Sequence, residues 1–471
     1  MNAIPCLLMA GSQSGVGKSS LTLALVAAFR RRGLRVQTFK VGPDYLDPGH
    51  LAHVSGRPCY NLDGWMAGED YCRSLFADAC AKADIAIVEG VMGLFDGSSA
   101  ESLSGSTAEM ASWLKLPVLL VVNAHGMARS IAALVKGYSE FDERVSISGV
   151  IANMCGSESH GRWLQQALVA AAAPPLLGTV TRDAFPELPS RHLGLVSAQE
   201  TDWSAPLIDR LCELAEHAID LDKLLRQSVT VPPIKASEEK TFPRTAWRGL
   251  KLAVARDEAF QFYYADLFDA LHGRGVEIQF FSPLDDDSVP LHCDGLYLGG
   301  GYPELYGHKL AANEAMRHSI MEFCSSGKPV YAECGGLIYL CREVAVDNEI
   351  WPMVGVLPSR ARMLQKRKAL GYVEATLQVP TLFGAVGTRL RGHEFHYSEL
   401  CDDPIGKDGW QAAYHLRKNR GAQVRDEGYQ KGNILASYAH LHLASQPQAL
   451  DSWVENMYAA QDTTRSNNEK S

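Results

Sequence analysis

A glycine-rich run has residue types and spacing that suit phosphate binding. Positions 11–20 read GSQSGVGKSS, between an apolar segment and a segment with helical spacing of apolar residues. Glycines let backbone N–H groups close around phosphate oxygens, Lys18 adds a cation, and the hydroxyl of Ser19 can bind Mg²⁺. A glycine-rich turn without chemistry is the alternative, which the flanking strand and helix disfavour. The predicted ATP-binding residues are Gly11, Gly15, Val16, Gly17, Lys18, Ser19, Ser20 and Lys40.

Two further segments place charged side chains where predicted strands end. Positions 39–48 read FKVGPDYLDP, and positions 87–97 read IVEGVMGLFDG. Ligands bind at the carboxyl ends of parallel strands, so we expect Lys40 near the γ-phosphate and Asp44 and Glu89 near Mg²⁺. The predicted metal ligands are Ser19, Asp44 and Glu89. The predicted substrate contacts are Asp44, Tyr45, Asp47 and Asp96, the last two with a plain turn as the alternative.

A second site is predicted around a cysteine. Positions 331–336 read YAECGG after an apolar strand, so Cys334 lies on a tight strand-to-helix turn that exposes a nucleophile. The N-terminus of the following helix favours the thiolate. A buried inert cysteine is the alternative. Upstream, the glycines at 299–301 predict oxyanion N–H groups from Gly300 and Gly301, a signal that is weak by itself.

Two late histidines are candidates for the base that a cysteine nucleophile needs. Positions 436–442 read ASYAHLH and contain His440 and His442. Side chains two residues apart on a strand point the same way, so His442 is predicted to orient His440. In the string RGHEFHYS, His393 and His396 are spaced for one helix face, without a third ligand that would support zinc. We interpret that string as scaffolding of the second domain, with a contact to substrate or to an interdomain channel left open.

Strand and helix patterns alternate through both halves of the chain. Short apolar strands separated by helices predict a doubly wound parallel sheet in the first half and a second α/β unit after it. The predicted strands are 5–10, 35–41, 85–88, 118–122 and 150–152, then 252–255, 277–281, 295–298 and 329–332. The predicted organisation is a P-loop domain at 1–226, a linker at 227–247, a second domain at 248–461 and a disordered tail at 462–471.

Composition limits the class of protein. The chain has 471 residues, 46% hydrophobic and 21% charged, which suits a globular protein with sizeable cores. The net charge of -9 argues against a nucleic-acid surface, because phosphate backbones need a basic footprint. No apolar stretch approaches the roughly 20 residues of a membrane span, and no leader pattern is seen, so we expect a cytoplasmic location. The 11 cysteines show neither CxxC pairs nor zinc spacing.

The strings FKVGPDYLDP and VEGVMGLFDG, with the phosphate loop, resemble the cobyrinic acid a,c-diamide synthase family of corrin-ring amidotransferases. Gly11 lies one residue before the usual first glycine, where Ser12 stands, and this longer loop is similar to that of dethiobiotin synthetase, which phosphorylates a carboxylate. The Cys334 turn with its triple glycine resembles class I glutamine amidotransferases, and the Tyr-x-His of corrin amidotransferases maps the catalytic role onto His440. Class I members carry a glutamate where this chain has His442, so the third member of the triad stays open.

This resemblance covers nearly the whole chain and implies a P-loop synthetase domain followed by a class I glutamine amidotransferase-like domain. It implies ATP- and glutamine-dependent amidation of the a and c carboxylates of cobyrinate in cobalamin biosynthesis, through acyl phosphates and with Mg²⁺ as cofactor. The implied partners are cobyrinate, L-glutamine and ATP, with no nucleic acid and no membrane, and a homodimer is left open. The alternatives are a hydrogenobyrinate or nickel-tetrapyrrole a,c-diamide synthase, and a non-catalytic P-loop ATPase assembly module, which the Cys334 and His440 pair disfavours.

Overall fold

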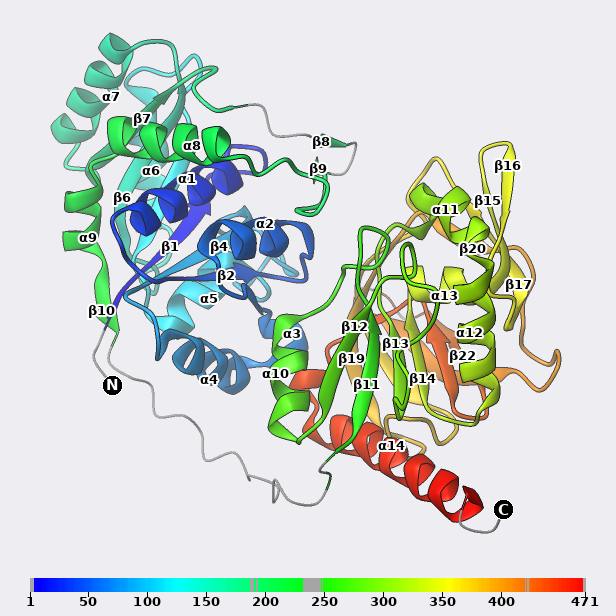
Figure 1. The fold of residues 1–471 in the computed structure, drawn as a ribbon. Coiled ribbons are helices and arrows are strands. Elements are labelled where there is room, and N and C mark those ends of the chain that lie inside the picture. Colours follow the sequence, from blue (N-terminus) through cyan, green and yellow to red (C-terminus); the bar gives the residue numbers. More distant parts are fainter. Residues whose placement is uncertain are drawn as a thin grey trace. The chain divides into compact units, whose positions relative to one another are not determined.

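The structure is a computed structural model that describes residues 4–186, 190–191, 194–231, 247, 249–419, 421 and 423–468 (Figure 1). The chain divides into two compact units, Met1–Glu239 and Lys240–Ser471. Most of the predicted linker at 227–247 lies outside the described residues, although a short strand begins within it at Val229. The domain limits given by the sequence therefore stay predictions.

A mostly parallel sheet forms the centre of the first unit. Its strand order is β3-β2-β4-β1-β5-β6-β7, with parallel neighbours throughout, and β10 pairs antiparallel with β1. The strands are continuous apolar runs because both faces of the sheet are covered. They are β1 (Ile4–Gly11), β2 (Val36–Val41), β3 (Tyr60–Leu62), β4 (Ile85–Gly93), β5 (Val118–Asn123), β6 (Ile147–Cys155), β7 (Leu176–Thr181) and β10 (Val229–Val231).

Helices cover both faces of this sheet, which confirms the predicted α/β fold. They are α1 (Lys18–Arg31), α2 (Leu46–Ser55), α3 (Gly64–Ala67), α4 (Glu69–Cys80), α5 (Thr107–Leu114), α6 (Ser130–Glu140), α7 (Glu158–Ala170), α8 (Ala205–Ala218) and α9 (Leu221–Gln227), with a ribbon of β8 (Ser190–Arg191) and β9 (Gly194–Leu195). Along β1, Leu8 and Ala10 face the core shared with α4 to α7. Leu7 and Met9 face the opposite core, shared with α1, α2, α8 and α9.

The second unit is built on a 10-stranded sheet of order β12-β11-β13-β14-β23-β22-β21-β18-β19-β24. Pairing is parallel from β12 to β23 and antiparallel beyond. Its strands are β11 (Lys251–Ala255), β12 (Glu277–Phe281), β13 (Gly295–Leu298), β14 (Val330–Glu333), β18 (Ala369–Leu377), β19 (Arg389–His396), β21 (Gln411–Lys418), β22 (Val424–Lys431), β23 (Ile434–Ser437) and β24 (His440–Leu441). A 4-stranded sheet contains β16 (Glu349–Pro352), β15 (Cys341–Val346), β17 (Leu357–Met363) and β20 (Ser398–Leu400).

The helices of the second unit are α10 (Ala265–Gly273), η1 (Pro303–Tyr306), α11 (Gly307–Ala312), α12 (Glu314–Ser325), α13 (Gly335–Leu340), η2 (Leu443–Ser445) and α14 (Pro447–Asn468). The last helix, α14, continues past position 462, where the sequence predicts the start of a disordered tail. Within the part of the chain that the structure describes, every helix is too short or too polar to cross a membrane.

The antiparallel half of the sheet curves back toward its parallel half. Only Tyr438 and Ala439 separate β23 from β24, yet β22, β21, β18 and β19 lie between these two strands in the sheet. As a result the backbone N–H of Leu441 in β24 donates to Oε1 of Glu333 in β14 at 3.2 Å. This curvature brings His440 to the carboxyl end of β14, where the chain turns into α13.

The pairing of β19 corrects one prediction. His393 and His396 lie on a strand, where residues three apart point to opposite faces, so the shared helix face inferred from their spacing is wrong. His393 stacks on His440 with 5.0 Å between ring centroids, and His396 stacks on Tyr438 with 4.1 Å. Pairing with β18 and β24 decides the local structure here, and three-residue spacing alone carries no helix signal.

Candidate active site

The glycine-rich run forms the loop between β1 and α1. Gly15 and Gly17 have φ angles of 76° and 92°, in the left-handed region that residues with a Cβ rarely adopt. A Cβ on Gly17 would lie 2.3 Å from Nδ2 of Asn153, and that amide donates to the carbonyl of Val16 at 2.8 Å. Asn153 in β6 therefore fixes a loop whose shape suits phosphate binding at a helix N-terminus.

The residue that lengthens the loop, Ser12, is anchored from both sides. Its N–H donates to the carbonyl of Val121 in β5 at 2.9 Å, and its carbonyl accepts from the hydroxyl of Tyr138 in α6. The additional residue is thus absorbed by contacts with neighbouring elements, so the loop keeps a defined shape.

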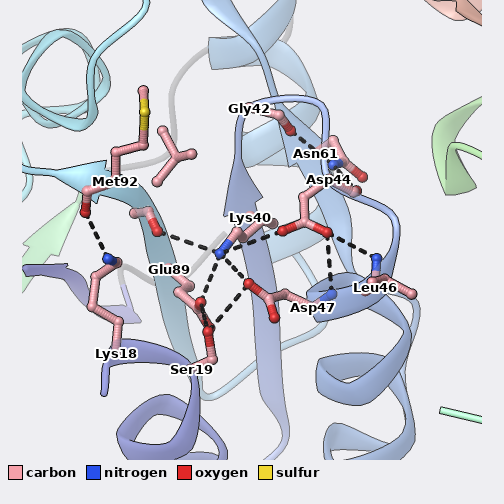
Figure 2. Close-up of polar contacts among 12 residues, drawn as sticks. Lys18, Ser19, Lys40, Gly42, Asp44, Leu46, Asp47, Asn61, Glu89 and Met92 are labelled. Carbon is pink, nitrogen blue, oxygen red and sulfur yellow. Dashed lines mark hydrogen bonds and ion pairs between the residues drawn. The ribbon is translucent and has the colours of Figure 1, made fainter. Parts of the chain in front are cut away.

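Lys18 is the first residue of α1, and its side chain is buried. Its Nζ donates to the carbonyl of Met92 at 2.6 Å (Figure 2). Burial, followed by repulsion from Lys40, lowers the pKa of Lys18. Phosphate oxygens bound at the loop would place negative charge next to this ammonium and stabilise it.

Lys40, the penultimate residue of β2, is surrounded by carboxylates (Figure 2). Its Nζ lies 2.5 Å from Oδ2 of Asp47, 2.7 Å from Oε1 of Glu89 and 3.8 Å from Oδ2 of Asp44. Burial opposes the charge, but these carboxylates outweigh it and raise the pKa of Lys40 well above its usual value. The same ammonium holds the pKa of Asp47 below its usual value in spite of burial. Lys40 is therefore a permanent buried cation at the edge of the sheet where ligands bind.

The Ser19 hydroxyl lies between two of these carboxylates. It donates to Oε1 of Glu89 at 2.7 Å and lies 3.2 Å from Oδ2 of Asp47. Within the described residues, the other oxygen of Glu89, Oε2, is buried without a hydrogen-bond partner. A buried carboxylate oxygen beside a hydroxyl is a donor set that fits Mg²⁺. Within the described residues, no group of three or more His, Cys, Asp or Glu could hold a metal ion by itself.

Asp44 and Asp47 make different contacts in the structure. Oδ1 of Asp44 accepts the N–H of Leu46 at 2.8 Å, and the carbonyl of Asp44 accepts from Asn61 at 2.7 Å, so this residue shapes the turn before α2 (Figure 2). Burial and repulsion from Asp47 raise the pKa of Asp44 to about 7. Asp47 is the aspartate that reaches Ser19. The assignment of Asp44 to the metal stays a prediction, and Asp47 is the nearer candidate.

The other residues predicted for this site lie around the same cluster. Asp96 is exposed, and its Oδ2 accepts the N–H of Gly93 at 3.1 Å, which is the turn contact kept as the alternative. Tyr45 precedes α2 and Ser20 lies in the first turn of α1, both half-buried. Gly11 is the last residue of β1. Their assignments to substrate and ATP remain predictions.

Cys334 lies between β14 and α13 in a conformation that non-glycine residues rarely adopt. Its φ is 45° and its ψ is -94°, and its N–H donates to the carbonyl of Ser437 at 2.7 Å. A Cβ on Gly336 would lie 2.1 Å from the carbonyl oxygen of Leu298, so a larger residue could not follow the turn this closely. The structure thus holds Cys334 on a tight strand-to-helix turn.

The thiol of Cys334 is not activated by its surroundings alone. Burial, followed by the charges of Glu304 and Glu333, raises its pKa. This shift is opposite to the one expected from the helix N-terminus, because α13 is short and burial outweighs it. The resting residue is a thiol, so a base must take its proton when the reaction begins.

His440 is buried beside this turn. Its Nδ1 lies 3.7 Å from Oε2 of Glu333, the residue that precedes Cys334. A Cβ on Gly300 would lie 2.5 Å from Cε1 of His440, so the imidazole packs directly against the glycine backbone. The sheet therefore brings together three predicted elements of the second site: the nucleophile, the histidine and the triple glycine.

Gly301 lies on the other side of the turn. A Cβ on Gly335 would lie 3.0 Å from the backbone nitrogen of Gly301, so this nitrogen borders the nucleophile. The preceding carbonyl, of Gly300, accepts the N–H groups of Gln261 and Phe262, each at 3.0 Å, which fixes the loop. The geometry suits an oxyanion donor at Gly301, and the role of both glycines stays a prediction.

His442 has partners that the sequence did not indicate. Its Nδ1 lies 3.0 Å from the hydroxyl of Ser445, and its Nε2 lies 3.4 Å from Oδ2 of Asp266. Its ring packs on Tyr264 with 4.8 Å between centroids. Because β24 ends at Leu441, strand alternation does not extend to His442. Its support of His440 stays a prediction.

Sequence reasoning missed several residues that shape the two sites. They are Asn61, Met92, Tyr138, Asn153 and Glu333. Asn153 and Glu333 each stand near the carboxyl end of an apolar strand, and that pattern alone could have identified them as candidates. Met92 acts through its carbonyl and Tyr138 through a contact that only the fold creates, so no sequence pattern points to either.

Two family models match the chain. The CobQ/CobB/MinD/ParA nucleotide binding domain matches residues 7–196. The CobB/CobQ-like glutamine amidotransferase domain matches residues 251–448. The first match covers the phosphate loop and the Lys40 cluster, and the second covers the Cys334 turn and His440.

Curated relatives are similar over almost their full lengths. A cobyrinate a,c-diamide synthase of Syntrophotalea carbinolica is 52% identical over 452 residues, which is 96% of this chain and 98% of the relative. Enzymes of the same name from Leptospira interrogans and Priestia megaterium are 42% and 39% identical, over 96% and 98% of this chain and 98% of each relative.

Proposed function

This chain belongs to the cobyrinate a,c-diamide synthase family, and we propose that it amidates the a and c carboxylates of cobyrinate with ammonia that it releases from glutamine. ATP activates each carboxylate, and the reaction belongs to cobalamin biosynthesis. The observation that carries the proposal is the presence in one chain of two sites. One is the phosphate loop with the buried Lys40 cluster, and the other is Cys334 on its strained turn beside His440.

In the second unit, the thiol of Cys334 attacks the side-chain amide carbon of glutamine while His440 takes the thiol proton. The tetrahedral oxyanion forms next to the backbone N–H of Gly301. His440 then gives the proton to the leaving nitrogen, so that ammonia departs and a glutamyl thioester remains. Water hydrolyses the thioester, which releases glutamate and restores the thiol.

In the first unit, a substrate carboxylate attacks the γ-phosphorus of ATP, and ADP leaves. Lys18 and Lys40 neutralise the phosphate charge that would otherwise repel the incoming carboxylate. The product is an acyl phosphate, whose carbonyl carbon ammonia attacks. Phosphate then leaves in place of hydroxide, and one amide is formed per ATP.

A metal ion is implied by this chemistry, and the residues present fit it. Ser19 and Glu89, with Asp47 next to them, would hold Mg²⁺ bound to ATP, and the ion would spread the negative charge of the phosphates. The support is the pairing of the Ser19 hydroxyl with Glu89 and the unpartnered oxygen Oε2 of Glu89 within the described residues.

An aromatic group beside the phosphate loop offers a surface for the flat tetrapyrrole. The ring centroid of Phe95 lies 4.8 Å from that of Phe141 and 5.7 Å from that of Tyr138. Phe141 is 71% exposed and Met92 44%, although both are apolar. Tyr138 holds the loop at Ser12, so this surface is continuous with the phosphate site. A macrocycle packed on it would present its peripheral carboxylates to ATP.

The variant Phe141→Ala is expected to raise the KM for the tetrapyrrole by roughly tenfold, because it removes one large apolar contact. Hydrolysis of glutamine, measured without tetrapyrrole, should be unchanged. The matched control is Trp163→Ala, which removes an aromatic side chain that is 67% exposed on α7. Steady-state kinetics decide the matter: equal KM values for both variants and the parent would show that the macrocycle binds elsewhere.

The function is tested by incubating the protein with ATP, glutamine and one tetrapyrrole at a time, and by reading product mass. Cobyrinate should give the diamide, with glutamate and ADP as co-products. Conversion of hydrogenobyrinate or a nickel tetrapyrrole in preference to cobyrinate would replace the substrate and keep the chemistry. Absence of glutamate formation under all conditions would favour the assembly module.

A further inference from the structure

The base of a cysteine nucleophile needs a third group that fixes its tautomer. A neutral imidazole can take the thiol proton on one nitrogen only if the other nitrogen carries its hydrogen, and an acceptor at that second nitrogen holds this form. The proposed function requires such an acceptor for His440. The sequence offers His442 at the expected place, but the structure pairs His442 with Asp266 and Ser445.

Glu333 is the carboxylate that faces His440. It is 2% exposed, and its Oε2 lies 3.7 Å from Nδ1 of His440. Glu333 ends β14, so the backbone that carries the nucleophile also carries this acid. A distance of 3.7 Å is longer than a hydrogen bond, as catalytic contacts often are before the substrate binds.

Other contacts hold the Glu333 carboxylate in place. The hydroxyl of Tyr297 donates to Oε2 at 2.7 Å, the hydroxyl of Tyr331 donates to Oε1 at 2.5 Å, and the N–H of Leu441 donates to Oε1 at 3.2 Å. All three groups are donors, which suits an ionised carboxylate because it can only accept. Leu441 directly follows His440, so the same carboxylate also fixes the backbone beside the imidazole.

Glu333 is placed to stabilise a protonated imidazole of His440. Glu304 and Glu394 also bring negative charge near Cys334. From β19, His393 stacks on His440, and burial followed by repulsion from His440 and His442 lowers the pKa of His393 well below its usual value. His393 is therefore neutral. Cys334, on the turn after β14, is a thiol at rest and carries no charge.

We infer that Glu333 is the positioning acid of the second site, which accepts the Nδ1–H of His440 so that Nε2 can take the thiol proton. This inference rests on the proposed release of ammonia from glutamine at Cys334, and it assigns the third member of the triad. Glu333 touches neither glutamine nor the reacting atoms in this scheme. It acts through His440.

The test is the Glu333→Gln variant, which keeps the shape of the side chain and removes its charge. The rate of glutamine hydrolysis should fall by roughly 10²-fold, as expected when a histidine loses its orienting acid. The acidic limb of the profile of kcat/KM for glutamine against pH should move to lower pH by about one unit, because a carboxylate that favours the imidazolium has been lost. Amidation with ammonium salt should be unchanged.

Two matched controls separate positioning from stability. Glu427→Gln replaces the carboxyl group of another buried glutamate of the same sheet, which binds the hydroxyl of Ser437 and the N–H of Tyr438. It should leave the acidic limb where it is in the parent. Asp266→Asn removes the acid that pairs with His442, and it should also leave the limb unmoved.

A second measurement does not depend on the folding of any Glu333 variant. In the parental protein labelled with ¹⁵N-histidine, the signal of His440 is assigned by its loss in His440→Gln. It should report the tautomer with hydrogen on Nδ1. A hydrogen on Nε2 would overturn the inference, as would an unshifted acidic limb in Glu333→Gln or a shift reproduced by Asp266→Asn. If the parental protein itself hydrolyses no glutamine, the proposed function fails instead.

Discussion

The variant Cys334→Ser, which replaces sulfur by oxygen, is expected to reduce glutamine-dependent amidation by roughly 10³-fold or more. It should leave ammonia-dependent amidation intact. The buried site already raises the pKa of the thiol, so His440 must remove a proton that is held tightly. A serine hydroxyl holds its proton more tightly still and is a poorer nucleophile. The first unit, which contains the phosphate loop, keeps its residues unchanged and can use ammonia from solution.

The measurement is product mass for the variant and the parent under both nitrogen sources, at a pH where free ammonia exists. His440→Ala should behave like Cys334→Ser. Cys341→Ser is the matched control, because Cys341 is also buried and directly follows α13, where its sulfur donates to the carbonyl of Leu337. Two outcomes would contradict the division of labour between the two units. One is that Cys334→Ser uses glutamine at the parental rate, and the other is that it stays folded but loses ammonia-dependent amidation.

The parts of the fold that the sequence predicts are those decided by local pattern. The sequence shows an apolar run at 5–10, glycines at 15 and 17 and helical spacing at 19–32, one after another and without distant partners. The structure has β1, the loop and α1 in that order. Most parallel strands of both units are predicted for the same reason, because buried strands are short apolar runs between helices. The parallel strands β3, β7 and β23 were not predicted.

The parts that the sequence could not predict depend on distant pairing. The strands from β15 to β22 are half-exposed and carry charged residues, so their pattern is weak, and their order in the sheet follows from contacts far apart in the chain. The curve that places β24 against β14 is one such outcome. This curvature explains why Glu333 was missed. Glu333 comes close to His440 only because the sheet brings Leu441, the next residue, to the Glu333 carboxylate.

The first site contains a buried cation, Lys40, at the place where we expect phosphate to bind. Lys40 is surrounded by three carboxylates, and Ser19 lies among two of them. These charges compensate one another in a buried place, which would otherwise be costly. Lys18 is compensated less fully, because burial and repulsion from Lys40 outweigh the attraction of the nearby carboxylates and lower its pKa. The phosphate charge of ATP would therefore act most strongly on Lys18.

The variants Lys18→Ala and Glu89→Gln are accordingly expected to lower amidation by roughly 10²- to 10³-fold with glutamine and with ammonium salt alike, because each removes a contact to phosphate or its metal ion. Hydrolysis of glutamine by Cys334 should continue in both variants, which shows that they fold. Lys136→Ala, which removes a half-exposed lysine on α6, is the control and should keep the parental rate. Product mass under both nitrogen sources checks the expectation. Near-normal amidation with free ammonia in Lys18→Ala would show that the phosphate loop does not transfer phosphate to the carboxylate.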